Sequence, residues 1–289
     1  MTTMALTREA AVRAPRRITG FWPTSPALVL LTVFFVAPVL GLLLRSVLEP
    51  QPGLQNYVEV FGSTTYLRVF VNTFVVATIV TVATLLLAFP VAWFLAVAPR
   101  QWASLLFAVI LLSMWTNLLT RTYAWMVLLQ GTGIINKTLM GWGLIAAPLP
   151  LINNLTGVTI GMTYIMLPFM VLPLQGTIRS LDPATFRAAS LCGANRWQVF
   201  TRVFVPLAVP GIGAGVLMVF VMSLGYFVTP ALLGGTSNMM LAELIAQLVQ
   251  SLLNWGLAGA AALILLVVSL GIYAVQFRFF GFKAAGEVE

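Results

Sequence analysis

The sequence predicts an all-α integral membrane protein with about six transmembrane helices and both termini in the cytoplasm. First, 60% of its 289 residues are hydrophobic and only 8% are charged, whereas soluble domains average about half and about a quarter. Second, long charge-free intervals recur, and a helix needs about 20 apolar residues to cross the hydrocarbon core. Third, a single cysteine and no histidine exclude a disulfide framework, the usual zinc or haem ligand sets and histidine-based catalytic triads.

The first expected span covers about residues 27–44 and extends at most to residue 48. Four arginines precede it, as in the opening of a signal peptide: Arg8, Arg13, Arg16 and Arg17. The apolar run is roughly 18 residues long, which exceeds the apolar region of a signal peptide and suffices to span the bilayer. We therefore expect an uncleaved first helix that follows a cytoplasmic segment at 1–25.

Five further spans follow from the remaining charge-free intervals. We expect them at about residues 74–96, 103–119, 155–174, 210–230 and 256–276. Gly211 and Gly215 in the fifth have the spacing that lets two helices approach closely, and we attribute it to ordinary packing. Residues 26–280 thus form one transmembrane domain, with a short tail at 281–289.

The basic residues predict the orientation. With the N-terminus inside, the four basic residues on the outer side are Arg45, Arg68, Arg121 and Lys137. The cytoplasmic side receives 11 of the 15, namely Arg8, Arg13, Arg16, Arg17, Arg100, Arg179, Arg187, Arg196, Arg202, Arg278 and Lys283. Cytoplasmic loops of membrane proteins carry such an excess. Because these charges are scattered between apolar runs, nucleic-acid binding is not indicated.

Two connections on the expected outer side are unusually apolar. Residues 120–154 are rich in glycine and tryptophan and predict an interfacial helix followed by a loop. Residues 229–255 contain Gly234 and Gly235 and then an amphipathic stretch at about 241–252. Neither connection has the polarity of a soluble domain.

The cytoplasmic loop between the fourth and fifth spans, residues 181–208, predicts two short helices. Asp182 followed by Pro183 is a strong helix start, and Gly193 suits the position after the end of that helix. Asn195 can cap a second helix, on which Trp197 and two phenylalanines share one face. Such a pair of helices fits docking against a partner as well as it fits an amphipathic connector in the headgroup layer.

A motif in this loop resembles the EAA motif of binding-protein-dependent ABC importer permeases. Arg187-Ala188-Ala189 is followed by three residues, Gly193, nine residues, and then Val203-x-Val205-Pro206, which is the family's spacing. Arg187 replaces the usual glutamate, and valines replace isoleucine and leucine. The segments 121–125 and 227–235 are in addition similar to spermidine/putrescine-type permeases of the first, "B" kind.

The resemblance implies a type I ABC importer permease in the bacterial inner membrane, forming half of a solute pathway. Its implied partners are a second homologous permease, two ATPase subunits and a periplasmic binding protein, and the loop would be the coupling element that the ATPase receives. The implied coupling residues are Asp182, Arg187, Ala188, Ala189, Gly193, Ala194 and Pro206. The implied solute is a polyamine; an amino-acid-like amine, ferric iron and a phosphonate stay open.

The chain cannot itself use ATP, so we expect no cofactor in it. A phosphate-binding loop needs Gly-Lys followed by Ser or Thr, and the two lysines, Lys137 and Lys283, follow Asn136 and Phe282. ATP and magnesium would be bound by the partner ATPase. An ion-coupled secondary transporter is the alternative, along with a membrane scaffold. Proton coupling is disfavoured because the spans carry almost no acidic side chains.

The solute path requires polar or aromatic groups at depth. Aromatic faces together with one carboxylate can hold a cationic amine. Aromatic residues also gather at membrane interfaces regardless of function, and Arg121 argues mildly against a cation path. The candidate residues are Asn117, Arg121, Trp125, Tyr226 and Glu243.

Overall fold

The computed structural model describes residues 21–280, and all regular structure within that range is helical. The first span is a single rod made of α1 (Phe21–Leu31), a π-helical turn η1 (Thr32–Val36) and α2 (Ala37–Leu48). The remaining elements are α3 (Gln55–Gly62), α4 (Thr64–Val97), α5 (Arg100–Trp115), α6 (Leu118–Leu129), α7 (Ile134–Gly141), α8 (Leu155–Ser180), α9 (Pro183–Leu191), α10 (Arg196–Val199), η2 (Phe200–Phe204), α11 (Val205–Leu224), α12 (Val228–Leu233), η3 (Thr236–Asn238), α13 (Leu241–Gln250) and α14 (Trp255–Phe280).

Within the described range, five helices are long and apolar enough to cross a membrane, and a sixth candidate is a bent pair. The five are Thr24–Leu48, Thr64–Val97, Leu155–Ser180, Arg196–Leu224 and Trp255–Gln276. The sixth joins Arg100–Trp115 to Leu118–Gly141 with a bend of 102°. The prediction of an all-α chain with about six spans is confirmed.

The predicted bounds of the third and fifth spans are wrong. The third helix ends at Trp115 rather than at residue 119, because the Asn117 side chain caps a new helix, α6. The fifth begins at Arg196 and ends at Leu224, whereas the sequence predicted a span at about residues 210–230 that follows a separate short helix of the loop. The two form one continuous helix because η2 lets Val205 donate to the carbonyl of Phe200, five residues back, before α11 starts at Val205 and Pro206.

The core lies where α4, α8 and α11 cross. Gly211 and Gly215 bring α11 against α8: a Cβ atom at Gly211 would meet Thr177 Cβ at 2.6 Å, and one at Gly215 would meet Met170 Sδ at 2.6 Å. These glycines therefore serve close packing, as predicted. The fully buried side chains at this crossing include Val76, Val80, Met162, Met166, Met170 and Val219.

A second apolar cluster joins α14 to α13 and to the start of α4. It contains Leu241, Leu244 and Leu248 of α13, packed on Leu257 and Ala258 of α14. Helix α14 also runs along α2, where glycines again allow the contact: a Cβ at residue 259 would lie 2.5 Å from a carbonyl oxygen of α2. The N-terminal rod is thus attached to the bundle through α14.

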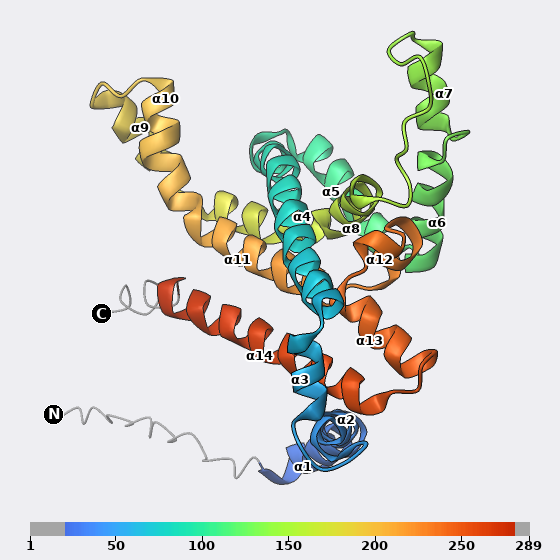
Figure 1. Ribbon diagram of the computed structural model, residues 1–289. Coiled ribbons are helices and arrows are strands. Elements are labelled where there is room, and N and C mark those ends of the chain that lie inside the picture. Colours follow the sequence, from blue (N-terminus) through green and yellow to red (C-terminus); the bar gives the residue numbers. More distant parts are fainter. Residues whose placement is uncertain (1–20, 281–289) are drawn as a thin grey trace, which may run out of the picture.

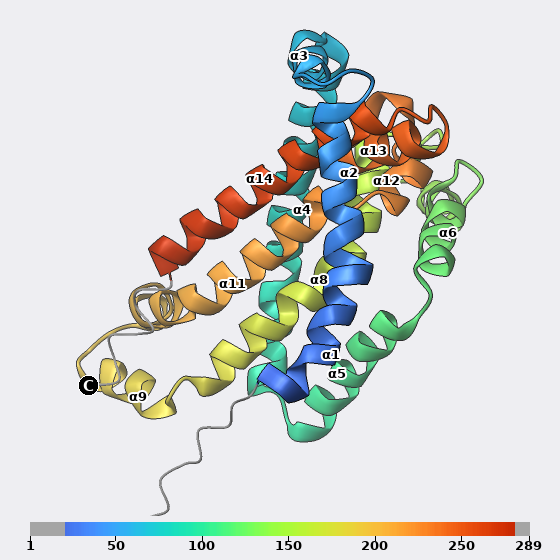
Figure 2. The same cartoon turned by 90° about the horizontal axis from the view of Figure 1, so that it is seen from below.

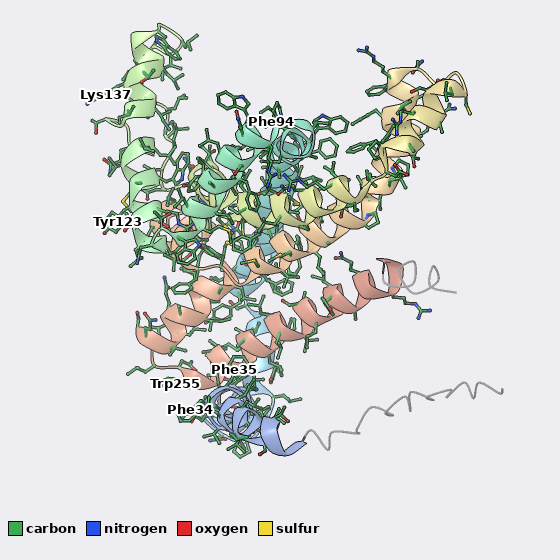
Figure 3. The ribbon with its side chains drawn as sticks, turned by 180° about the vertical axis from the view of Figure 1, so that it is seen from behind. Phe34, Phe35, Phe94, Tyr123, Lys137 and Trp255 are labelled. Carbon is green, nitrogen blue, oxygen red and sulfur yellow. The ribbon has the colours of Figure 1, made fainter. Side chains whose placement is uncertain are left out.

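The bundle has two distinct ends (Figure 2). Helix α9 and the start of α5 lie at one end, and α3, α12 and α13 lie at the other. Helices α6 and α7 form an arm that leaves the bundle (Figure 1), and Figure 3 shows Tyr123 and Lys137 on it. The predicted cytoplasmic segment at 1–25 lies almost wholly outside the described residues, as do the tail at 281–289 and five of the basic residues used to predict orientation.

Candidate functional site

The loop that carries the EAA-like motif has the two predicted helix starts, although its second helix continues into the fifth span. Asp182 Oδ1 accepts a hydrogen bond from the backbone N–H of Ala184 (2.8 Å) and begins α9. Gly193 has a φ of 82°, in the left-handed region that glycine adopts freely. Asn195 and Gln198 then form a capping box, each side chain accepting from the other's backbone N–H at 2.8 and 2.9 Å. Local chemistry thus defines both helices of the loop.

Five of the seven predicted coupling residues have exposed side chains or backbone. Arg187, Ala188 and Gly193 are exposed, and so is Pro206, while Ala189 and Ala194 are half-buried. Leu191 at the end of α9 is 89% exposed. A short helix that presents small and apolar side chains outward has the surface of a docking element. That the ATPase docks here stays a prediction.

Aromatic side chains fasten the loop to the bundle. Phe204 is 2% exposed and lies against Trp93 of α4, with ring centroids 4.5 Å apart. Phe89 of α4 and Phe186 of α9 contact the same ring at 5.9 and 6.3 Å. Phe204 belongs to the continuous helix that becomes α11, so its ring connects α9 and α4 with a helix of the core.

Two segments singled out in the sequence, 121–125 and 227–235, meet at the other end of the bundle. The hydroxyls of Thr122 in α6 and Thr229 in α12 lie 3.3 Å apart, although 107 positions separate them in the chain. Burial raises the pKa of the Tyr226 phenol, and the nearby charge of Arg121 and a hydrogen bond with Thr229 partly oppose this. The Nε atom of Arg121 is buried and has no hydrogen-bond partner within the described range.

Trp125 extends this group toward the core. Its ring meets Tyr164 of α8 edge to face, with centroids 5.5 Å apart. Ser113 of α5 donates a hydrogen bond to the Tyr164 hydroxyl at 2.9 Å. Arg121, Trp125, Tyr164 and Tyr226 form a polar and aromatic group. We call it the outer cluster, after the side of the membrane on which the sequence places it.

The two remaining candidates, Asn117 and Glu243, lie at the start of α6 and in α13. Asn117 is exposed, and its side chain accepts from the backbone N–H groups of Leu119 and Thr120 at 2.9 and 3.3 Å. Its visible role is to start α6 at the bend. The Asn117 carbonyl accepts a hydrogen bond from the backbone N–H of Arg121 at 3.1 Å, whereas no ion pair within residues 21–280 joins Glu243 to Arg121.

Glu243 is a buried carboxylate in the first turn of α13. It is 7% exposed, and its Oε2 atom has no hydrogen-bond partner in the described part of the chain. Burial raises the pKa of this carboxyl, and a hydrogen bond from the backbone of Met240 partly opposes the shift. Helix α13 is held in place at its start, because Thr73 Oγ1 of α4 accepts from the N–H of Leu241 at 2.8 Å. A fixed, underused acceptor of this kind suits a cationic ligand.

The sequence did not predict several of these contacts. Tyr164 was a detectable signal, since a tyrosine in the middle of a span needs a partner for its hydroxyl. The pairing of Thr122 with Thr229 gave no signal of its own. Trp93 and Phe89 looked like ordinary apolar positions of a span, and only the structure shows that they receive Phe204.

Comparison with known proteins places this arrangement among transport components. Residues 71–279 match the family model described as "Binding-protein-dependent transport system inner membrane component". The chain is 36% identical over 219 residues to the spermidine/putrescine transport system permease protein PotB of Escherichia coli (strain K12), covering 76% of this chain and 79% of that protein. It is 34% identical over 225 residues to the protein of the same name from Haemophilus influenzae, covering 78% of both.

A solved structure shows the same fold at low sequence identity. It is the crystal structure of a bacterial alginate ABC transporter in complex with an alginate pentasaccharide-bound periplasmic protein. One of its chains superposes with a TM-score of 0.72 and 20% identity, covering 89% of this chain and 92% of that one. At that identity the likeness concerns the fold alone.

Proposed function

Since the chain belongs to the family of binding-protein-dependent transport system inner membrane components, and is thus a permease subunit of an ABC importer, we propose that the solute it carries is a polyamine. It is a multi-pass inner-membrane transport subunit, and ATP is hydrolysed by a partner. The ion-coupled and scaffold alternatives no longer apply. The family implies a second permease, an ATPase and a binding protein as partners.

The observation that carries the polyamine proposal is the identity to the two PotB proteins over three quarters of the chain. Both segments that form the outer cluster, 121–125 and 227–235, lie within the family match at 71–279. On the same similarity we propose a more specific set of partners. The second permease is a different but related chain, and two ATPase subunits bind ATP and magnesium.

Residue chemistry supports a cationic solute at one position above all. Glu243 offers a buried oxygen that lacks a partner within the described range, and the ammonium group of a polyamine would satisfy it. Trp125 and Tyr226 supply aromatic faces, which attract ammonium groups. The charge of Arg121 beside Tyr226 repels a cation there, so the ammonium group is placed at Glu243 rather than within the outer cluster.

The proposed mechanism is alternating access. A loaded binding protein docks at the end that carries α3, α12 and α13, and ATP-driven closure of the ATPases moves α9 at the opposite end. Phe204 lies in the helix that runs unbroken from Arg196 to Leu224, so the movement reaches α11 and the α4–α8–α11 crossing. Opening of that crossing would expose the path beside α13.

The proposal is tested by the solute specificity of the ATPase. The assembled importer in nanodiscs, with its binding protein, is given spermidine, putrescine, a basic amino acid, ferric iron or a phosphonate. We expect ATP hydrolysis to rise with the polyamines only. Stimulation by another solute of this panel, with none by the polyamines, would leave the importer assignment in place and overturn the substrate.

A further inference from the structure

A cavity of about 450 Å³ opens at the α9 end of the bundle, between the end of α4, the start of α5 and the end of α8. Two arginines line it, Arg100 of α5 and Arg179 of α8. Ser104 of α5 adds a hydroxyl, and the apolar lining includes Leu95 and Phe107. Neither the coupling loop nor the proposed solute path uses this cavity.

Within residues 21–280, neither guanidinium group forms an ion pair with a carboxylate. Arg179 Nη2 donates to the carbonyl oxygen of Leu95 at 3.1 Å, which leaves its remaining N–H groups for another acceptor. Asp182 follows three positions later but caps α9 instead. In the part of the chain that the structure describes, the one salt bridge joins Arg45 to Glu49. Two cations at one membrane-embedded cavity favour an anionic ligand.

The lining changes from charged to apolar along α5. Four lining residues share one face of this helix because they occupy positions i, i+3, i+4 and i+7: Arg100, Ala103, Ser104 and Phe107. The helix rises about 1.5 Å per residue, so this face passes from guanidinium to aromatic ring over about 10 Å. Trp102 in the same first turn is 62% exposed, as is typical of a residue at the headgroup level.

We propose that this cavity binds the headgroup of an anionic phospholipid. Arg100 and Arg179 hold the phosphate and Ser104 donates to it, while the first methylene groups of an acyl chain lie on Ala103 and Phe107. Free phosphate carries the same negative charge but has no apolar group that could contact the apolar part of the lining. Arg179 also borders a second, largely apolar cavity of about 290 Å³ whose wall includes Pro183 and Phe186 of α9. A lipid at Arg179 therefore steadies the base of the coupling loop.

The test measures lipid retention by the complete importer, purified with its partner subunits. Native mass spectrometry counts phosphatidylglycerol against phosphatidylcholine after exchange into a mixture of both. The variants are Arg100→Gln and Arg179→Gln, with Arg202→Gln as the matched control. Arg202 is exposed near the same loop and lines neither cavity.

We expect phosphatidylglycerol retention to fall about fivefold in each of the two cavity variants and to stay unchanged in Arg202→Gln, because one arginine near an anionic surface contributes about that factor. Arg179→Gln also loses the hydrogen bond to the Leu95 carbonyl and can therefore be unstable. In that case Arg100→Gln decides whether the cavity binds the lipid, because its side chain makes no hydrogen bond within the described residues. Equal retention in all variants, or an equal loss in Arg202→Gln, would overturn the proposal. Displacement of the lipid by millimolar inorganic phosphate would show a free-anion site instead. Retention only in complexes stripped of the ATPase would assign the arginines to an acidic surface of that partner.

Discussion

Glu243 stands out among the individual residues because a buried carboxylate with a partnerless oxygen is costly to keep. An ammonium ligand removes that cost, and a protonated carboxyl cannot pair with it in the same way. The proposed role of Glu243 in transport therefore requires the ionised carboxylate, and burial disfavours that form when no ligand is bound.

Uptake is expected to depend on pH through this residue. Its pKa is raised by burial, so Glu243 takes up a proton at a higher pH than an ordinary glutamate. As the pH falls through the mildly acidic range, polyamine uptake by the wild type should decline. The Glu243→Gln variant should take up at least about tenfold less at neutral pH, since an ammonium–carboxylate contact is worth about 1.5–3 kcal/mol, and should lose the acid-side decline. Initial uptake rates from pH 5 to 8 measure both effects, and a wild-type profile retained by the variant would exclude Glu243.

At the scale of elements, the coupling loop contacts α4 through the rings of Phe200 and Phe204, of which Phe204 is buried and lies nearer to Trp93. Phe204→Ala removes a buried side chain that touches Trp93, Phe89 and Phe186. We expect a loss of about 3 kcal/mol in stability and ATP hydrolysis that no longer drives uptake at the normal ratio. Trp197→Ala is the control, because Trp197 is 71% exposed and its removal should leave stability within about 0.5 kcal/mol. Thermal unfolding and the ratio of solute to ATP are measured together; equal effects of both variants would contradict this role of Phe204.

The crossing of α8 and α11 provides a second test at this scale. Gly211→Ala places a methyl group against the stiff, branched side chain of Thr177 and should destabilise the protein by about 1–3 kcal/mol. Gly176→Ala on α8 is the matched change, since a Cβ there meets nothing within 4 Å. It should be neutral or stabilise by up to about 1 kcal/mol. Denaturation in a mild detergent compares the two, and a stable Gly211→Ala variant would mean that the helices do not pack this closely.

Which elements were predictable follows from how local their causes are. The caps at Asp182 and Asn195 involve residues two or three positions apart, so the sequence predicts them. The bend after Trp115 occurs in a run without charged residues, where the charge pattern indicates one straight span. The continuity across Pro206 depends on the π-helical turn before it and on Phe204 packing against α4, and both are tertiary effects.

The same distinction applies to the candidate site. The motif spacing from Arg187 to Pro206 predicted a coupling loop, and the structure confirms the helix caps at Asp182 and Asn195 while the coupling role stays a prediction. The meeting of Thr122 with Thr229 depends on where α6 and α12 are placed by the fold, and no local pattern encodes it. The sequence therefore predicted most members of the outer cluster but could not predict that, within the described residues, Glu243 forms no ion pair with Arg121.

At the scale of the whole molecule, the proposed function gives the two ends different partners, and the orientation of the ends is testable with the natural chain. Cys192 is the single cysteine and is exposed beside Gly193. A membrane-impermeant maleimide should label it in inside-out vesicles and not in right-side-out vesicles, since the account puts the coupling loop in the cytoplasm. Labelling after detergent solubilisation is the control for reactivity. Labelling from the outside would reverse the orientation.

The most direct measurement of the central claim is uptake of labelled spermidine into proteoliposomes that contain this chain with its co-purifying partners and the binding protein. We expect labelled spermidine to accumulate only with ATP inside and the binding protein outside, and we expect unlabelled putrescine to compete for its uptake. Accumulation of spermidine without ATP would contradict the assignment of this chain to an ATP-driven pathway. Uptake of another solute but no spermidine, with the ATPase still bound, would contradict the polyamine proposal.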